Sequence, residues 1–163
     1  MGKQKEVKTN AMRILDSLKI SYEHYTYECE EFIDAIQIAD KLGQPYEKMY
    51  KTLVTVGHSK NYFVFVIPIA EELDMKKAAK SVGEKSVAMI PVKEINAVTG
   101  YIRGGCTAIG MKKQYVTRID ESALEQEKMI VSGGKLGSQI ELTPLDFQKA
   151  AKAEFAQIIV KEA

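Results

Sequence analysis

The chain has 163 residues, of which 45% are hydrophobic and 28% are charged, and its formal net charge is +1. A chain of this size can bury one sizeable core, so we expect a single domain over residues 1–163. No window approaches the roughly 20 consecutive apolar residues of a membrane span, and residues 1–10 contain no apolar signal core. We therefore expect a cytoplasmic protein with no membrane partner.

Helical spacing of apolar residues predicts three amphipathic helices in the first 83 residues. Thr9 or Asn10 can cap the first helix, and Gly43 and Gly83 can end the second and third. The expected buried stripes are Ala11, Ile14, Leu15 and Leu18; Ala35, Ile38, Ala39 and Leu42; and Met75, Ala78, Ala79 and Val82. Alternating aromatic and β-branched residues predict strands over 22–27, 51–56 and 62–67, and the last two form a probable hairpin.

The second half of the chain predicts further strands around a glycine-rich loop. Strand composition over 86–90 precedes a short helix over 92–98, and the glycine-dense stretch 100–110 then breaks all periodicity. Strands are expected near 115–119, 129–131 and 140–142. A final helix opens at Thr143-Pro144 and is expected to bury Phe147, Ala150, Ala151 and Phe155. The strands are not separated by regular crossover helices, which favours a mixed α/β (α+β) fold, with a mixed sheet or barrel surrounded by helices.

Several kinds of chemistry find no support in the sequence. Cys29 and Cys106 are far apart and lack metal-ligand spacing, so neither a disulfide framework nor a metal site is expected. The only histidines are His24 and His58. Cys106 could pair with either as a nucleophile and its base, but the favoured interpretation is that Cys106 is a small side chain that fills space in the core. No phosphate-binding P-loop or dinucleotide fingerprint is present, so we expect no cofactor.

Two segments remain as candidates for chemistry. Lys51 begins an apolar strand, where a lysine is either a functional cation or a solvated gatekeeper against edge pairing. The glycine pairs at 104–105 and 133–134 either bring backbone N–H groups close to a ligand oxygen or form two ordinary tight turns. The recurring lysines in 76–85 and 112–113 form either a basic face for RNA phosphates or a solvated surface.

Five segments in sequence order decide between these alternatives. They are Lys51-Thr52-Leu53, LDMKKAAKSVG over 73–83, TGYIRGG over 99–105, GMKK over 110–113 and SGGKLG over 132–137. Together these segments closely resemble the YbaK/EbsC family of Cys-tRNA(Pro) deacylases. The likeness runs from about Thr9 to the C-terminus.

The resemblance implies a fold and a set of site residues. The fold is a mixed β-barrel with surrounding helices, related to the editing domain inserted in some prolyl-tRNA synthetases. The implied catalytic residues are Lys51 and Gly104. The implied substrate-binding residues are Tyr27, Thr52, Gly105, Ser132 and Gly133, and the implied tRNA-binding residues are Lys76, Lys77, Lys80, Lys112 and Lys113. The chain departs from the family at Ala108, usually proline, and at Gln139, an aspartate in some members, and an aromatic near Phe32 is not securely matched.

The resemblance also implies an activity, with alternatives. The thiol of a cysteine mischarged onto tRNA(Pro) attacks its own ester, which gives a cyclic thiolactone and free tRNA, and Cys-tRNA(Cys) is a second candidate substrate. The implied partners are aminoacyl-tRNA and prolyl-tRNA synthetase, and neither a metal nor a cofactor is implied. A deacylase that uses water on Ala-tRNA(Pro) is the alternative within this fold, and a non-catalytic module that binds tRNA or synthetase is the alternative outside it.

Overall fold

A computed structural model describes residues 8–29 and 31–161 of the chain. In these ranges eight strands form two sheets, a three-stranded sheet in the order β1-β7-β6 and a five-stranded sheet in the order β4-β2-β3-β5-β8. The strands are β1 (Glu23–Thr26), β2 (Tyr50–Gly57), β3 (Tyr62–Pro68), β4 (Val87–Met89), β5 (Val116–Asp120), β6 (Met129–Ser132), β7 (Ser138–Leu142) and β8 (Glu154–Ala156). The mixed α/β fold expected from the sequence is confirmed.

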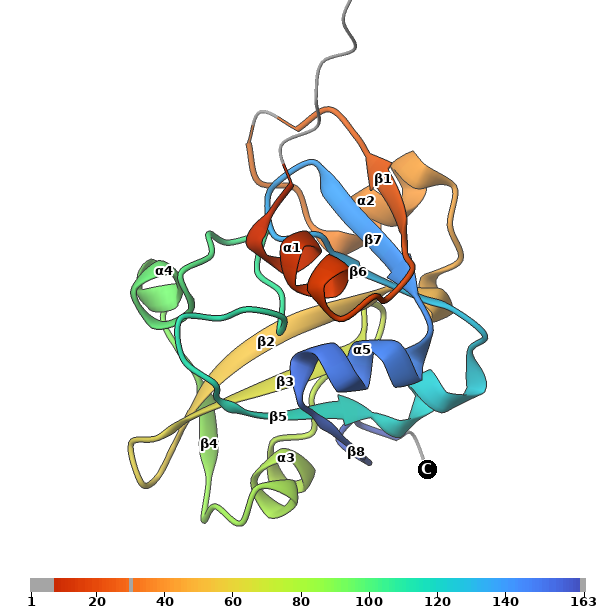
Figure 1. Cartoon of the computed structure of the whole chain (residues 1–163). Coiled ribbons are helices and arrows are strands. Elements are labelled where there is room, and N and C mark those ends of the chain that lie inside the picture. The colour runs from red at the N-terminus through yellow and green to blue at the C-terminus, as the bar shows by residue number, and fades with distance from the viewer. Residues whose placement is uncertain (1–7, 30, 162–163) are drawn as a thin grey trace, which may run out of the picture.

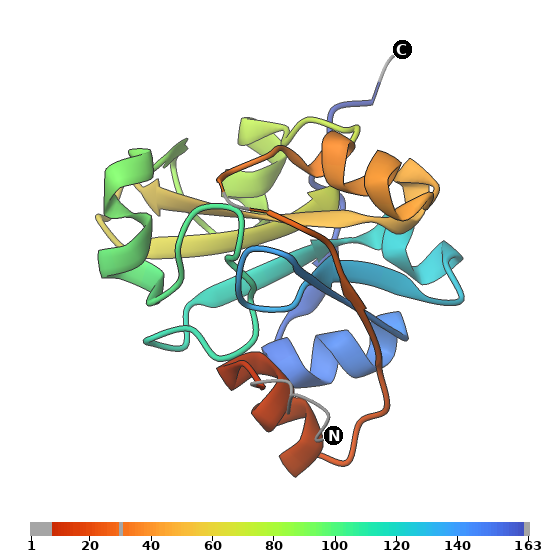
Figure 2. The ribbon, with the colours of Figure 1, turned by 90° about the horizontal axis from the view of Figure 1, so that it is seen from above.

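Five α-helices and three short 3-10 helices accompany the sheets in the described ranges. They are α1 (Asn10–Ser17), α2 (Ala35–Leu42), α3 (Met75–Ser81), α4 (Ile95–Thr99), α5 (Pro144–Ala151), η1 (Tyr46–Lys48), η2 (Val92–Glu94) and η3 (Glu121–Glu125). Figure 2 shows α1 and α5 on one side of the sheets and α2 and α3 on the other, whereas α4 lies at one end (Figures 1 and 2). None of the described helices has the length and apolar character needed to cross a membrane.

Local sequence signals set the helix ends. The Thr9 side chain accepts a hydrogen bond from the Met12 N–H and caps α1, and Asp34 and Gln37 form a capping box at α2. Both devices satisfy N–H groups that the first helical turn leaves unpaired. Gly43 ends α2 with φ of 65°, a left-handed conformation that favours glycine.

The hairpin of β2 and β3 divides the core because alternate side chains of a strand point to opposite faces. On one face, Phe65 and Ile67 of β3 pack with Ala78 and Ala79 of α3. On the other face, Val64 and Val66 join the largest cluster, which also contains side chains of α1 and α5. The two sheets meet at a parallel bridge between Met49 and Ile130, beside the start of β2.

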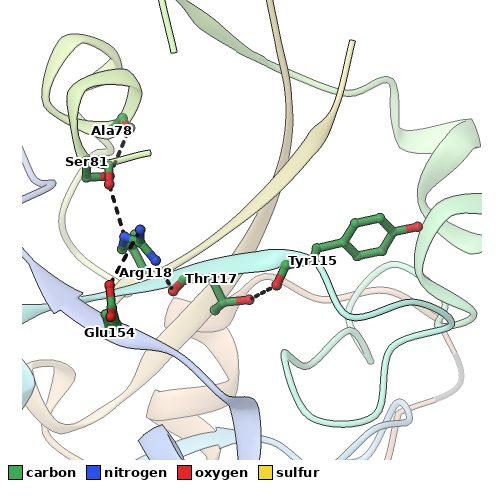
Figure 3. Close-up of polar contacts among 6 residues, drawn as sticks. All are labelled: Ala78, Ser81, Tyr115, Thr117, Arg118 and Glu154. Carbon is green, nitrogen blue, oxygen red and sulfur yellow. Dashed lines mark hydrogen bonds and ion pairs between the residues drawn. The ribbon is translucent and has the colours of Figure 1, made fainter. Parts of the chain in front are cut away.

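Arg118 joins three elements on the α3 side (Figure 3). Its Nε donates to the Ser81 carbonyl at the end of α3, at 3.1 Å, and its Nη1 donates to the Thr117 carbonyl at 3.2 Å. Its Nη2 lies 3.6 Å from a carboxylate oxygen of Glu154 in β8. The hydroxyls of Ser81 and Thr117 in turn donate to backbone carbonyls within their own segments. A cation at the carboxyl end of a helix also complements the helix dipole.

Two predicted burial positions are wrong, and a third residue, Phe155, packs against the core from a different element than predicted. Leu18 and Met75 are 37% and 40% exposed, because α1 ends at Ser17 and because Met75 is the first residue of α3. Phe155 belongs to the short strand β8 and not to the last helix, which ends at Ala151. Lys152 turns the chain there with φ of 54°, so Phe155 reaches its place in the core from a strand parallel to β5.

Candidate functional site

A cavity of about 510 Å³ lies beside the first half of β2. Its walls come from α2 and the segment before it, from the segment between β4 and α4, and from the glycine-rich loop around Gly104. Ser132 of β6 and Gln139 of β7 line it on the side of the smaller sheet. In Figure 2 the segment before α2 and the segment between α4 and β5 approach each other beside β2. Most of the lining side chains are apolar, as in sites for small organic groups.

Lys51 brings a half-buried amine to this cavity. It is the second residue of β2, and its Nζ donates to the Ile69 carbonyl oxygen at 3.1 Å. Burial lowers the pKa of Lys51, because an ammonium ion is less stable in apolar surroundings than in water, and the carboxylates of Glu72 and Glu71 partly oppose this shift. Among the described residues, Lys51 is the one lysine that lines this cavity, and its ammonium group is partly removed from water there.

The glycine-rich loop forms the wall at Gly104. Gly104 has φ of 84°, a left-handed conformation that favours glycine. At Gly105, a Cβ atom would lie 2.8 Å from the Cα of Lys135, so the backbones of the two glycine segments touch. The sequence could not show that these segments pack against each other. Their contact fixes the Gly104 backbone at the cavity.

Ser132 and Gln139 face the cavity as a cross-strand pair. They are opposite each other in the ladder of β6 and β7, and the Ser132 hydroxyl accepts a hydrogen bond from the Gly134 N–H at 3.2 Å. Gln139 is 4% exposed. It stands where the resemblance has an aspartate in some members, so this chain presents a neutral amide at a position where a carboxylate would add negative charge near Lys51.

Phe32 and Arg103 form the rim. The guanidinium carbon of Arg103 lies 3.8 Å from the centre of the Phe32 ring, a cation–π contact between the segment before α2 and the glycine-rich loop. Sequence analysis did not find Arg103 and could not place Phe32. The only signal in the sequence was an aromatic residue, Phe32, just before α2. Nothing in the sequence near Phe32 or Arg103 indicates that the two side chains are in contact.

Cys106 lines the cavity with a neutral thiol. Burial raises the pKa of Cys106 to about 11, and a hydrogen bond with Thr99 opposes this only in part. A thiol that stays protonated is a weak nucleophile. Neither histidine is among the residues that line this cavity. The backbone N–H of His58 donates to the Ser86 carbonyl at the tip of the β2–β3 hairpin, and the Nε2 atom of His24 lies 2.9 Å from the Ser138 hydroxyl. The structure does not pair either with Cys106.

Three predicted substrate contacts do not line the cavity. The N–H groups of Gly105 and Gly133 donate to the carbonyls of Ile102 and Ser138, at 3.0 and 2.9 Å, so in this structure both donors are bonded within the protein, and the substrate-binding role of the two glycines stays a prediction. Tyr27 packs beside α2. Its hydroxyl is buried with no well-formed hydrogen bond among the described residues, and burial raises its pKa although Gly137 and Gln139 partly oppose this. Thr52, in contrast, lines the cavity.

The five predicted tRNA-binding lysines belong to two segments of the chain, helix α3 and the loop before β5. Lys76 and Lys80 of α3 line a shallow depression next to β4, together with Lys85. The Nζ of Lys77 donates to the Ile159 carbonyl at 3.1 Å. The Nζ of Lys112 donates to the Ala97 carbonyl of α4 at 3.3 Å, so Lys112 lies beside α4. Within the described ranges, no group of three or more His, Cys, Asp or Glu side chains is arranged to hold a metal ion.

Comparisons with known proteins give a consistent result. Residues 29–150 match the family described as "Aminoacyl-tRNA editing domain". A protein of Enterococcus faecalis, named "Putative Cys-tRNA(Pro)/Cys-tRNA(Cys) deacylase EbsC", is 45% identical over 164 aligned positions, which cover 99% of this chain and all of that protein.

Solved structures share the fold at low sequence identity. A crystal structure of a hypothetical protein superposes with a TM-score of 0.82 and 20% identity, covering 91% of this chain and 97% of the other. A second structure, described as "a putative trans-editing enzyme for prolyl tRNA synthetase", gives 0.78 and 20%, covering 96% and 100%.

Proposed function

Because the chain belongs to the aminoacyl-tRNA editing domain family, we propose that it is a trans-editing deacylase that removes cysteine from Cys-tRNA(Pro). The 45% identical relative carries this activity in its name and aligns with the chain from end to end. The observation that carries the proposal is the half-buried Lys51 amine beside Gly104 and Ser132, in a cavity large enough for an aminoacyl-adenosine end.

In the proposed reaction the substrate supplies the nucleophile. The cysteine sulfur attacks the carbonyl carbon of its own ester and forms a C–S bond, and the carbonyl oxygen becomes an oxyanion. The C–O bond to the terminal ribose then breaks, and the ribose oxygen takes up the proton that the thiol lost. The products are a cyclic thiolactone and tRNA with a free 3′ end.

Each named residue has a stated task in this scheme. The ammonium group of Lys51 attracts the developing negative charge, and its low hydration strengthens that attraction. The Gly104 N–H is the donor that the glycine-rich loop offers to the oxyanion, since the Gly105 N–H is bonded to Ile102. Ser132 and the neutral Gln139 contact the aminoacyl group.

Selectivity follows from the chemistry more than from size. Shape alone separates side chains of similar volume by about 1–3 kcal/mol, so a requirement for a substrate thiol adds a second and stronger filter. We also infer that the chain acts in the cytoplasm beside prolyl-tRNA synthetase, with Lys76 and Lys80 as phosphate contacts that carry no sequence information.

The test is single-turnover deacylation of Cys-tRNA(Pro) and Ala-tRNA(Pro). Wild-type protein is expected to release cysteine and leave alanine bound. Lys51→Met is expected to slow cysteine release by about 10²–10³-fold, the usual cost of one group that stabilises an oxyanion. Lys149→Met, at an exposed lysine of α5, is the matched control and should react as wild type.

Other results would contradict specific parts of the proposal. Release of alanine would indicate the water-using Ala-tRNA(Pro) deacylase. Binding of tRNA without release of either amino acid would indicate a non-catalytic module. Loss of activity in Cys106→Ala together with full activity in Lys51→Met would place the nucleophile on the protein.

A further inference from the structure

The part of β2 inside the cavity has an edge without a neighbouring strand. Strand β4 pairs with β2 only from Thr55 to Gly57, and among the described residues the strand pairing next to β6 is the single Met49–Ile130 bridge just before β2. Between these two points no described strand pairs with the edge that faces away from β3. Thr52 and Val54 lie in this interval, and both line the cavity.

Hydrogen bonds at the ends of β2 show which backbone groups point to the free edge. The Val54 carbonyl accepts from the Ile90 N–H at 3.2 Å, on the side of β4. The Met49 carbonyl accepts from the Ile69 N–H at 3.0 Å, on the side of β3. Backbone groups alternate between the two edges along an antiparallel strand. The Thr52 C=O and the Val54 N–H therefore point to the free edge, one an acceptor and the other a donor.

The surroundings of this edge suit a flat aromatic group. Phe32 lies on one side of the cavity, and Met89 at the end of β4 lines it together with Val92 and Ile95, which follow β4 in the chain. Phe32 and Met89 are 37% and 44% exposed, so neither is fully covered by protein. An acceptor and a donor at a strand edge, between apolar side chains, can bind a planar ring that carries a donor beside an acceptor.

We propose that this edge reads the terminal adenine of the substrate. The Thr52 C=O accepts a hydrogen bond from the N6 amino group, and the Val54 N–H donates to N1, so the base extends the sheet as a short added strand would. The inference rests on the proposed function for its ligand, since every tRNA ends in adenosine.

The pairing predicts which bases fit. Inosine carries a carbonyl at position 6 and an N–H at position 1, so both hydrogen bonds would face groups of the same kind. Burying unpaired polar groups is costly, so inosine should bind at least about 10-fold more weakly than adenosine. Purine riboside lacks the amino group and should lie between the two.

The experiment is titration of uniformly ¹⁵N-labelled protein with adenosine, inosine and purine riboside, followed by backbone amide NMR. Adenosine is expected to move the Val54 amide proton downfield, because that proton enters a new hydrogen bond, and inosine is not. Phe32→Ala should weaken adenosine and inosine binding alike and keep their ratio. An unmoved Val54 amide at millimolar adenosine, or equal affinities for adenosine and inosine, would overturn the proposal.

The measurement is independent of turnover. Lys51→Met should still bind adenosine with the same Val54 shift, because Lys51 has no part in reading the base. If adenosine binds as expected but wild-type protein does not deacylate Cys-tRNA(Pro), the proposed activity fails and the base site stands. If deacylation occurs and Val54 does not respond, the base site fails and the activity stands.

Discussion

At the level of single residues, the Cys106 thiol differs from that of Cys29 by its surroundings. Burial raises the pKa of Cys106 to about 11, and only the thiolate reacts with alkylating reagents. We expect iodoacetamide at pH 8 to modify Cys106 about 10²-fold more slowly than an ordinary cysteine. Mass spectrometry of timed samples measures this, and urea-unfolded protein, in which both cysteines should react alike, is the control. Rapid native modification of Cys106 would contradict the burial argument.

The same shift affects stability in a defined direction. The unfolded Cys106 thiol ionises near its ordinary pKa of 9.0, whereas the folded one stays protonated until about 11. Between these values the unfolded chain binds fewer protons than the folded chain, so the free energy of unfolding falls as the pH rises. Burial raises the pKa of Tyr50 and Tyr101 to about 12, which acts in the same direction at higher pH.

At the level of elements, the contact between the two glycine segments predicts that alanine at Gly105 lowers both stability and activity, whereas alanine at a glycine outside this contact lowers stability alone. In Gly105→Ala the new Cβ would meet Lys135 backbone atoms at 2.8 and 2.9 Å, which cannot move as a side chain can. We expect a loss of about 1–3 kcal/mol of unfolding free energy and slower deacylation, because Gly104 shifts. Urea denaturation and single-turnover assays measure the two effects.

Gly83→Ala is the matched control. Gly83 has φ of 71° and no atom within 4 Å of its added Cβ. It should cost about 1–2 kcal/mol through backbone strain alone and leave deacylation unchanged. Equal loss of activity in both variants would mean that destabilisation, and not the position of Gly104, limits the rate.

Most elements were predictable because their signals are local. The caps at Thr9 and Asp34, the ending at Gly43 and the hairpin of β2 and β3 each depend on neighbouring residues. Phe155 was misplaced because strand β8 is only three residues long and exists through pairing with β5.

The candidate site likewise has a part that the sequence indicated and a part that only the structure shows. Chain context made Lys51 and Gly104 candidates, the family resemblance alone assigned them a catalytic role, and both residues line the cavity. The contact of Arg103 with Phe32 and the free edge of β2 depend on segments far apart in the chain. No local pattern encodes such contacts. The sequence could not show that the N–H groups of Gly105 and Gly133 are bonded within the protein, because a glycine that permits close packing and one that offers an N–H to a ligand look alike in sequence.

At the level of the whole molecule, the placement of lysines predicts how tRNA binding depends on salt. Lys76 and Lys80 flank an open depression, whereas the Nζ of Lys77 is bonded to the Ile159 carbonyl. Each phosphate contact adds about 0.7–0.9 to the slope of log K against log salt. Lys76→Ala and Lys80→Ala should each reduce that slope by about 1, and Lys77→Ala should reduce it less. Fluorescence anisotropy over a salt series measures the slopes, and an equal effect at all three lysines would refute this assignment.

The contact between Arg103 and Phe32 determines how often the rim of the cavity can open relative to the time of one catalytic turnover. A cation–π pair at an exposed site contributes about 0.5–1 kcal/mol, so the two loops stay together most of the time and part easily. Loop motions of this kind take nanoseconds to microseconds, and turnover of enzymes commonly takes a millisecond or longer. We therefore expect the rim to open many times during one catalytic cycle of the proposed reaction, so that it shields the ester from bulk water between openings without limiting the rate of entry or release.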